Sequence, residues 1–330
     1  MLPLPIFDHH RPRTLSEAVG LLARLGDRAV VIAGGTDLLP NMKQGLVEPE
    51  HVVSINAIEE LKGIRIDTAG EERLVVGAGA RLVEIADSVL VRLVAPALAD
   101  AASMVGGPHH RAMGTLGGNI CLDTRCRYYN QTYFWRKSLG FCLKKDGTVC
   151  HVVKGGSKCV AAASNDTAPA LIALDADIHL LGPRGARVVP ARDFYVADGI
   201  KNTVLEQGEL VVRVSIPRNR DRRSAYEKLR RRGAIDFPLL SIAVRVDLSP
   251  GSSDRIDAAD VVVSALGARP RRVRAASQCK PGTSIADLGR IFSEGAHAEC
   301  KPLPNVDEDT DWRRDMVPVL VDKALARALG

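Results

Sequence analysis

The chain has 330 residues, of which 46% are hydrophobic and 25% charged, which is typical of a globular protein with two or three domains. Its longest apolar runs fall far short of the roughly 20 residues that a membrane-spanning helix needs, so no membrane partner is expected. The first residues, MLPLPIFDHHRPR, lack the basic start and apolar centre of a signal peptide, which predicts a cytoplasmic protein.

The formal net charge of +6 is concentrated in one segment, because eight Lys and Arg but only two Asp lie between Cys121 and Cys159. So local a patch argues against a nucleic-acid partner and for a negatively charged group near the cysteines. In a reducing compartment, seven cysteines favour metal binding over disulfide formation.

The first expected element is an amphipathic helix at residues 14–26, with a capping box formed by Thr14 and Glu17 and a terminating Gly26. The apolar run AVVIAGG, residues 29–35, predicts a buried strand that enters a tight loop. Three β-rich runs follow within residues 51–79, and helical patterns occupy residues 81–104. This order predicts an α+β domain with mixed sheets rather than a regular parallel alternation.

Predicted helices and strands resume after the cysteine-rich segment. A polar, charged stretch at residues 218–224 marks a plausible domain boundary. The remaining expected elements are helix and strand at residues 169–182, strands at 208–217, 237–248 and 258–267, and a final helix at 312–329.

Two glycine loops, VIAGGTDLLP (residues 31–40) and GTLGGN (residues 114–119), are the first functional signal. Glycine lets backbone N–H groups line one concavity and lets a ligand approach without a Cβ in the way. Either loop alone is more often a structural turn, whereas the two together favour a dinucleotide. Neither has GxGxxG spacing, so nicotinamide binding by a Rossmann fold is disfavoured.

Five segments occur in the order and style of the FAD-binding medium subunits of molybdenum hydroxylases. They are VIAGGTDL, RAMGTLGGN, SNDTAPALIAL, GELVVRVSIP and YEKLRRRGAIDFPLLSIAVRV. The chain therefore resembles the flavoproteins of the xanthine dehydrogenase and carbon monoxide dehydrogenase families over nearly its whole length.

This resemblance implies an α+β fold with a vanillyl-alcohol-oxidase-like FAD-binding domain and a C-terminal α+β domain of the carbon monoxide dehydrogenase flavoprotein type. The FAD-binding domain would have two subdomains, residues 1–55 and 56–220, and the C-terminal domain would be residues 221–330. Asn119 is separated by 46 residues from Asp166, which aligns with the acidic residue of the family's SPxSD-type stretch. Roughly forty of these residues are extra, which places an insertion at about 122–162.

The resemblance also implies the cofactor site. The first loop would wrap the FAD pyrophosphate with backbone donors and the Thr36 hydroxyl, and the second loop would form the other wall. Asp166 would hold a polar part of FAD, and Lys228 would lie near the flavin ring, where a cation stabilises the anionic reduced form. Val211 would pack on the cofactor or serve only the core. Ala112 departs from the asparagine that the family often has, which puts any role of Arg111 in doubt. The expected cofactor-binding residues are Val31, Ile32, Ala33, Gly34, Gly35, Thr36, Asp37, Leu38, Thr115, Leu116, Gly117, Gly118, Asn119, Asp166, Val211 and Lys228.

Four cysteines of the insertion, Cys126, Cys142, Cys150 and Cys159, have no CxxC spacing, so they form neither a zinc ribbon nor a ferredoxin motif. On spacing alone a four-thiolate zinc site and an unligated loop both stay open. A flavin electron carrier as host favours an iron–sulfur cluster, whose charge of about −2 the local Lys and Arg would offset. Six aromatic residues between Tyr128 and Phe141 would form a dry shell for it, a small satellite core, or both.

A medium subunit with such an insertion resembles the β subunits of 4-hydroxybenzoyl-CoA reductases. That resemblance implies a 4Fe–4S cluster on the four cysteines, with Cys121 as the competitor of Cys126 for one ligand position. His109 and His110 are interpreted as loop residues, and Cys279 and Cys300 as structural or incidental.

The implied assembly is a dimer of heterotrimers with a molybdopterin-binding large subunit and a small subunit that carries two 2Fe–2S clusters, with ferredoxin as electron donor. No substrate chemistry is expected on this chain. Three alternatives stay open: the medium subunit of another molybdenum hydroxylase, a stand-alone FAD oxidoreductase with a structural zinc loop, and a zinc-stabilised interaction module.

Overall fold

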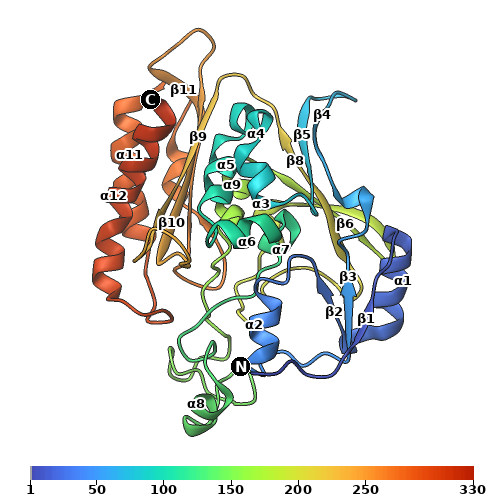
Figure 1. Ribbon diagram of the computed structural model, residues 1–330. Helices are drawn as coiled ribbons and strands as arrows, with labels where there is room; N and C mark the ends of the chain where they lie inside the picture. Colours follow the sequence, from blue (N-terminus) through green and yellow to red (C-terminus); the bar gives the residue numbers. More distant parts are fainter. Residues whose placement is uncertain (1) are drawn as a thin grey trace.

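The computed structural model describes residues 2–330 and contains three β-sheets (Figure 1). The first sheet is parallel, in the order β1-β3-β2, and has α1 packed against it. The predicted first helix is confirmed as α1, since the Glu17 amide donates to Thr14 Oγ1 at 3.2 Å and Gly26 ends the helix with a φ of 62°. The elements of this region are β1 (Asp8–His10), α1 (Leu15–Leu25), the 3-10 helix η1 (Gly26–Arg28), β2 (Ala29–Ile32), α2 (Leu38–Lys43) and β3 (His51–Ser54).

The second sheet is antiparallel, in the order β4-β5-β8-β6-β7, and seven short helices accompany it. The helix α9 is buried at every residue, because it packs against the third sheet and against three neighbouring helices. The elements are η2 (Glu59–Leu61), β4 (Ile64–Asp67), β5 (Arg73–Gly77), α3 (Leu82–Asp87), α4 (Val89–Val94), α5 (Pro96–Ser103), α6 (Pro108–Met113), α7 (Leu116–Ile120), α9 (Thr167–Ala173), β6 (Asp177–Gly182), β7 (Gly185–Pro190), α10 (Ala191–Phe194) and β8 (Leu210–Pro217).

The third sheet is also antiparallel, in the order β12-β11-β10-β9, with β13 paired to β11. Two long helices, α11 and α12, cover one face, and α5 and α9 contact the other (Figure 1). Because both faces are covered, eight of the nine residues of β10 are buried, including the polar Ser241, Arg245 and Asp247. The elements are β9 (Arg222–Leu229), β10 (Leu240–Leu248), β11 (Arg255–Ser264), β12 (Arg271–Arg272), η3 (Arg274–Gln278), β13 (Thr283–Ser284), α11 (Ile285–Glu299) and α12 (Thr310–Leu329).

The cysteine-rich segment, which we define as residues 122–162, protrudes from the body as a loop with one helix, α8 (Tyr133–Ser138) (Figure 1). Its two ends lie side by side. The Arg125 amide donates to the Ala162 carbonyl at 2.9 Å, and the Ala162 amide donates back to Arg125 at 2.7 Å. The segment therefore leaves and re-enters the fold through one closed neck.

Two expectations need correction. Parallel and antiparallel pairing are divided between sheets rather than mixed within one sheet, because only β1, β2 and β3 are joined by crossovers that make parallel pairs. His109 and His110 lie in α6 and not in a loop, since Pro108 occupies the first helical position. Within residues 2–330, no helix is both long enough and apolar enough to cross a membrane.

Candidate functional site

A cavity of about 630 Å³ lies between the two glycine loops, a volume within the range of sites for cofactors and other small ligands. It is lined by all of the expected cofactor-binding residues except Leu116 and Lys228. Leu116 is completely buried in the hydrophobic core. Val211 lines the cavity and also belongs to that core.

The first loop offers free backbone donors. Within the described chain, no acceptor is bonded to the amides of residues 34–38, which all line the cavity. Gly34 fits against the end of α6 so closely that a Cβ would lie 2.1 Å from the Met113 carbonyl oxygen, and Gly35 has a φ of 70°. Unpaired amides in a glycine turn suit the oxygens of a pyrophosphate, so this loop fits FAD.

The second loop is a wall rather than a donor set. The amides of Leu116 and Gly117 donate to the carbonyls of Ala80 and Ala78 at 2.9 and 2.8 Å, and the Gly118 amide donates to Thr115 Oγ1 at 3.1 Å. A Cβ on Gly117 would lie 2.9 Å from that of Ala78. Its glycines therefore permit close packing on the second sheet.

Asp166 lies at the cavity wall, at the start of α9, and is almost fully buried. It accepts hydrogen bonds from the Tyr226 hydroxyl at 2.5 Å and from Lys228 Nζ at 3.0 Å. Burial raises the pKa of Asp166, and the Lys228 charge opposes that rise. Lys228 also donates to the Met104 carbonyl at 3.0 Å, so its ammonium lies behind Asp166 and not at the cavity surface.

Several lining residues were not anticipated, among them Arg125, Ile235, Phe237 and His110. The Arg125 guanidinium lies 3.8 Å from the centre of the Phe237 ring and 3.4 Å from Asp37 Oδ1. Burial lowers the pKa of Arg125, and Asp37 opposes this shift. The only sequence signal for these lining residues is IDFP, residues 235–238, which places Ile235 and Phe237 in an otherwise polar loop after β9.

A second, smaller cavity of about 20 Å³ is lined by Cys126, Cys142, Cys150 and Cys159. Each of these residues is at most 8% exposed. Cys121 is exposed and lines the large cavity instead. The structure thus brings the four expected ligands together and leaves their competitor apart.

Backbone amides donate to two of these sulfurs. The Val153 amide donates to Cys150 Sγ at 3.5 Å, and the Ala161 amide donates to Cys159 Sγ at 3.4 Å. Burial raises the pKa of Cys126 to about 11, and the other three thiols add to the rise. In residues 2–330 no three His, Cys, Asp or Glu side chains are placed to hold a metal ion, so the thiols surround a space rather than meet at one point.

The aromatic shell is only partly as expected. Tyr128 and Tyr129 line the small cavity and belong to a satellite core with Cys126, Cys142 and Cys159, so the satellite-core interpretation holds for two of the six aromatic residues. Phe134 is 82% exposed, and Tyr133 and Trp135 are exposed as well. Arg136 is instead the buried residue of α8. Its guanidinium donates a hydrogen bond to the Gly45 carbonyl at 3.1 Å and forms an ion pair with Asp146 at 3.3 Å.

Comparison with known protein families matches nearly the whole chain. Residues 5–219 match the FAD-binding domain in molybdopterin dehydrogenase, and residues 224–328 match the CO dehydrogenase flavoprotein C-terminal domain.

Individual relatives agree with this assignment. The carbon monoxide dehydrogenase medium chain of Hydrogenophaga pseudoflava is 33% identical over 99% of this chain and 98% of that one. A xanthine dehydrogenase FAD-binding subunit of Escherichia coli O157:H7 is 25% identical over 98% and 96%. A solved carbon monoxide dehydrogenase structure from H. pseudoflava superimposes with a TM-score of 0.78 at 29% identity, over 99% of this chain and 98% of its own. The chain therefore belongs to the FAD-binding medium subunits of the molybdenum hydroxylase family, which includes the CO and xanthine dehydrogenases.

Proposed function

We propose that this chain is the electron-transfer flavoprotein subunit of a molybdenum-containing reductase of the 4-hydroxybenzoyl-CoA reductase type. The observation that carries the proposal is the cysteine-rich segment, which gathers four buried thiols around one cavity next to the flavin cavity. A loop of this length with a single short helix is uncommon unless it has a function.

The donor set fits a 4Fe–4S cluster. Each thiolate of such a cluster binds its own iron, so four sulfurs around a space suit it better than four that converge on one ion. The amides bonded to Cys150 and Cys159 are hydrogen bonds of the kind that tune cluster potentials. Because the cavity is no larger than about one water molecule, cluster binding must move the sulfurs apart.

The proposed enzyme removes the phenolic hydroxyl of 4-hydroxybenzoyl-CoA. Two electrons and two protons convert this substrate into benzoyl-CoA and water, and this chain supplies electron transfer only. FAD and the cluster would relay electrons between ferredoxin and the partner subunits, a 2Fe–2S small subunit and a molybdopterin-binding large subunit in a dimer of heterotrimers. The exposed Lys137, Lys154 and Lys158 of the cysteine-rich segment would favour an acidic ferredoxin.

The first test is the content of iron, acid-labile sulfide, zinc and flavin in anaerobically purified protein. We expect about four iron and four sulfide per FAD. Cys142→Ser should lose iron and keep FAD, whereas the matched control Cys279→Ser, in the C-terminal domain, should keep both.

Other outcomes separate the alternatives. Zinc with flavin, or flavin without metal, would remove the reductase assignment and leave the medium subunit of another molybdenum hydroxylase. If the complete heterotrimer holds about four iron per FAD beyond those of its 2Fe–2S subunit but fails to convert 4-hydroxybenzoyl-CoA with a low-potential electron donor, the substrate assignment is wrong and the cluster assignment stands.

A further inference from the structure

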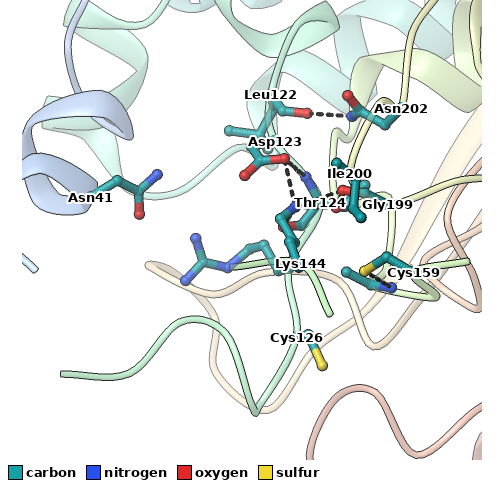
Figure 2. A network of polar contacts seen from close by, with 12 residues as sticks. Asn41, Leu122, Asp123, Thr124, Cys126, Lys144, Cys159, Gly199, Ile200 and Asn202 are labelled. Carbon is teal, nitrogen blue, oxygen red and sulfur yellow. Dashed lines mark hydrogen bonds and ion pairs between the residues drawn. The ribbon is translucent and has the colours of Figure 1, made fainter. Parts of the chain in front are cut away.

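The two cavities meet at one ion pair. Asp123 lines the large cavity, and Lys144 lines the small one together with the cysteines. Lys144 Nζ lies 2.7 Å from Asp123 Oδ1. In Figure 2, Lys144 lies between Asp123 on one side and Cys126 and Cys159 on the other.

The position of Lys144 is fixed. Besides Asp123, its ammonium donates to Thr124 Oγ1 at 2.5 Å, to the Thr124 carbonyl at 3.0 Å and to the Gly199 carbonyl at 2.8 Å (Figure 2). It also lies 4.5 Å from the centre of the Tyr129 ring. Since its side chain is only 6% exposed, solvent screens this charge far less than it screens a surface lysine.

The pair has a direction, because Lys144 lines the small cavity together with the cysteines, whereas Asp123 lines the flavin cavity. The neighbouring pair, Asp37 and Arg125, has no such direction. Both of its members line the large cavity, 3.4 Å apart, so they offset each other there.

We propose that the Asp123–Lys144 pair sets the relative reduction potentials of the two redox groups, raising that of the cluster and lowering that of the flavin. Reduction adds one negative charge to a cluster, and the Lys144 charge stabilises that form. The Asp123 carboxylate destabilises negative charge on the reduced flavin. Together they oppose electron transfer from cluster to flavin, the direction that a ferredoxin donor requires, and so reduce the potential difference that drives it. This inference rests on the proposed function, since it needs both groups on this chain.

The decisive variant is the double substitution Asp123→Asn with Lys144→Met, which removes the dipole without leaving an unpaired buried charge. We expect the two potentials to move in opposite directions in potentiometric titrations followed by EPR for the cluster and by absorbance for the flavin. The cluster potential should fall and that of the flavin should rise. A tenfold change in the cluster's reduction equilibrium corresponds to 59 mV for one electron.

The single variants should give a different pattern. Lys144→Met should lower both potentials, the cluster's more, whereas Asp123→Asn should raise both, the flavin's more. Lys145→Met is the matched control, because it removes the same charge one residue away. Lys145 is 35% exposed, pairs with Asp146 and does not line the small cavity. It should shift neither potential by a comparable amount.

Three results would contradict either this inference or the proposed function. If the double variant keeps its iron and both potentials stay unchanged or move together, the oriented-pair inference is wrong. If the double variant loses iron, Asp123→Asn decides alone, and an unchanged flavin potential would refute the inference. A wild-type chain without iron would refute the proposed function instead.

Discussion

Gly34 of the first loop lies so close to Met113 and to Gly114, the first residue of the second loop, that a Cβ would not fit between them. Gly34→Ala should therefore separate the first loop from α6, with loss of bound flavin and a lower melting temperature. Gly20→Ala is the control, because nothing lies within 4 Å of the added Cβ in α1. It should stabilise the protein by roughly 0.5–1 kcal/mol and leave flavin content unchanged. Equal flavin loss in both variants would contradict this role.

Asp260, on β11, gives a pH dependence with a defined sign. Burial raises its pKa from 3.8 to about 7, although Arg272 lies beside it. Between about pH 4 and 7 the native state holds a proton that the unfolded chain has released, so stability falls as pH rises through this range. Each pH unit costs at most about 1.4 kcal/mol.

Asp260→Asn removes this titration, so the variant should gain stability relative to wild type as pH rises from 4 to 7. Chemical denaturation at several pH values measures the difference. Asp257→Asn, at an exposed position on the same strand, should follow the wild-type curve. Parallel curves for all three proteins would contradict the raised pKa.

At the scale of single residues, the sequence predicted the positions whose residue type has a distinctive chemistry, namely the glycines of the two loops and the clustered cysteines. The free amides of residues 34–38 follow from the pair Gly34 and Gly35, because glycine makes such a loop accessible. Arg125 and Lys144 were not predicted as site residues. A basic side chain carries no signal of the partner it meets across the fold, and both partners, Phe237 and Asp123, are distant in sequence.

Among the structural elements, the cysteine-rich segment is the one whose order would depend most on the proposed cluster. It holds little regular structure, and three of the six buried residues of its satellite core are cysteines. Without the cluster, that core buries few apolar side chains, so the segment should open far more readily than the sheets. Trypsin should then cleave at the exposed Lys154 and Lys158.

Limited proteolysis of iron-loaded and iron-depleted protein measures this difference. Cleavage in residues 122–162 should be at least several-fold faster after chelation, whereas any cleavage near Arg220, outside the segment, should keep its rate. Equal rates within the segment would show that the cluster does not order it.

Prediction of the elements succeeded where local signals were complete. The helix α1 carries its cap, its apolar face and its terminator within one stretch. The helix α11 was missed, because Gly289 and Gly295 interrupt its pattern and give it low intrinsic propensity. It forms because Leu288 and Phe292 pack on the third sheet, and tertiary burial of this kind is invisible in a local window.

At the scale of the whole molecule, ion pairs of Asp175 connect the FAD-binding domain to the third sheet. Asp175 follows α9, and its carboxylate pairs with Arg245 on β10 and, at 2.6 Å, with Arg272 on β12. Asp175→Asn should leave both guanidinium groups without their shared counter-charge. Because the Asp175 side chain is 34% exposed, we expect a loss of roughly 1–3 kcal/mol rather than the full cost of breaking a buried pair.

Differential scanning calorimetry should show the transition of the Asp175→Asn variant at lower temperature or split in two. Asp193→Asn, which removes a 62% exposed carboxylate on α10, should leave the wild-type profile unchanged. A single, unshifted transition for Asp175→Asn would show that the domains are held mainly by apolar contacts.

The closed neck at Arg125 and Ala162 makes the cysteine-rich segment a removable cassette. Paired residues of an antiparallel bridge have Cα atoms about 5.5 Å apart, so a short glycine link could replace everything between them. The shortened chain should still bind FAD and lack iron. With the proposed cluster on this segment, a lineage of flavoproteins could gain or lose an entire redox centre at this point without redesigning its fold. Grafting the cassette onto a medium subunit that lacks it would then add a second entry point for electrons to an existing enzyme.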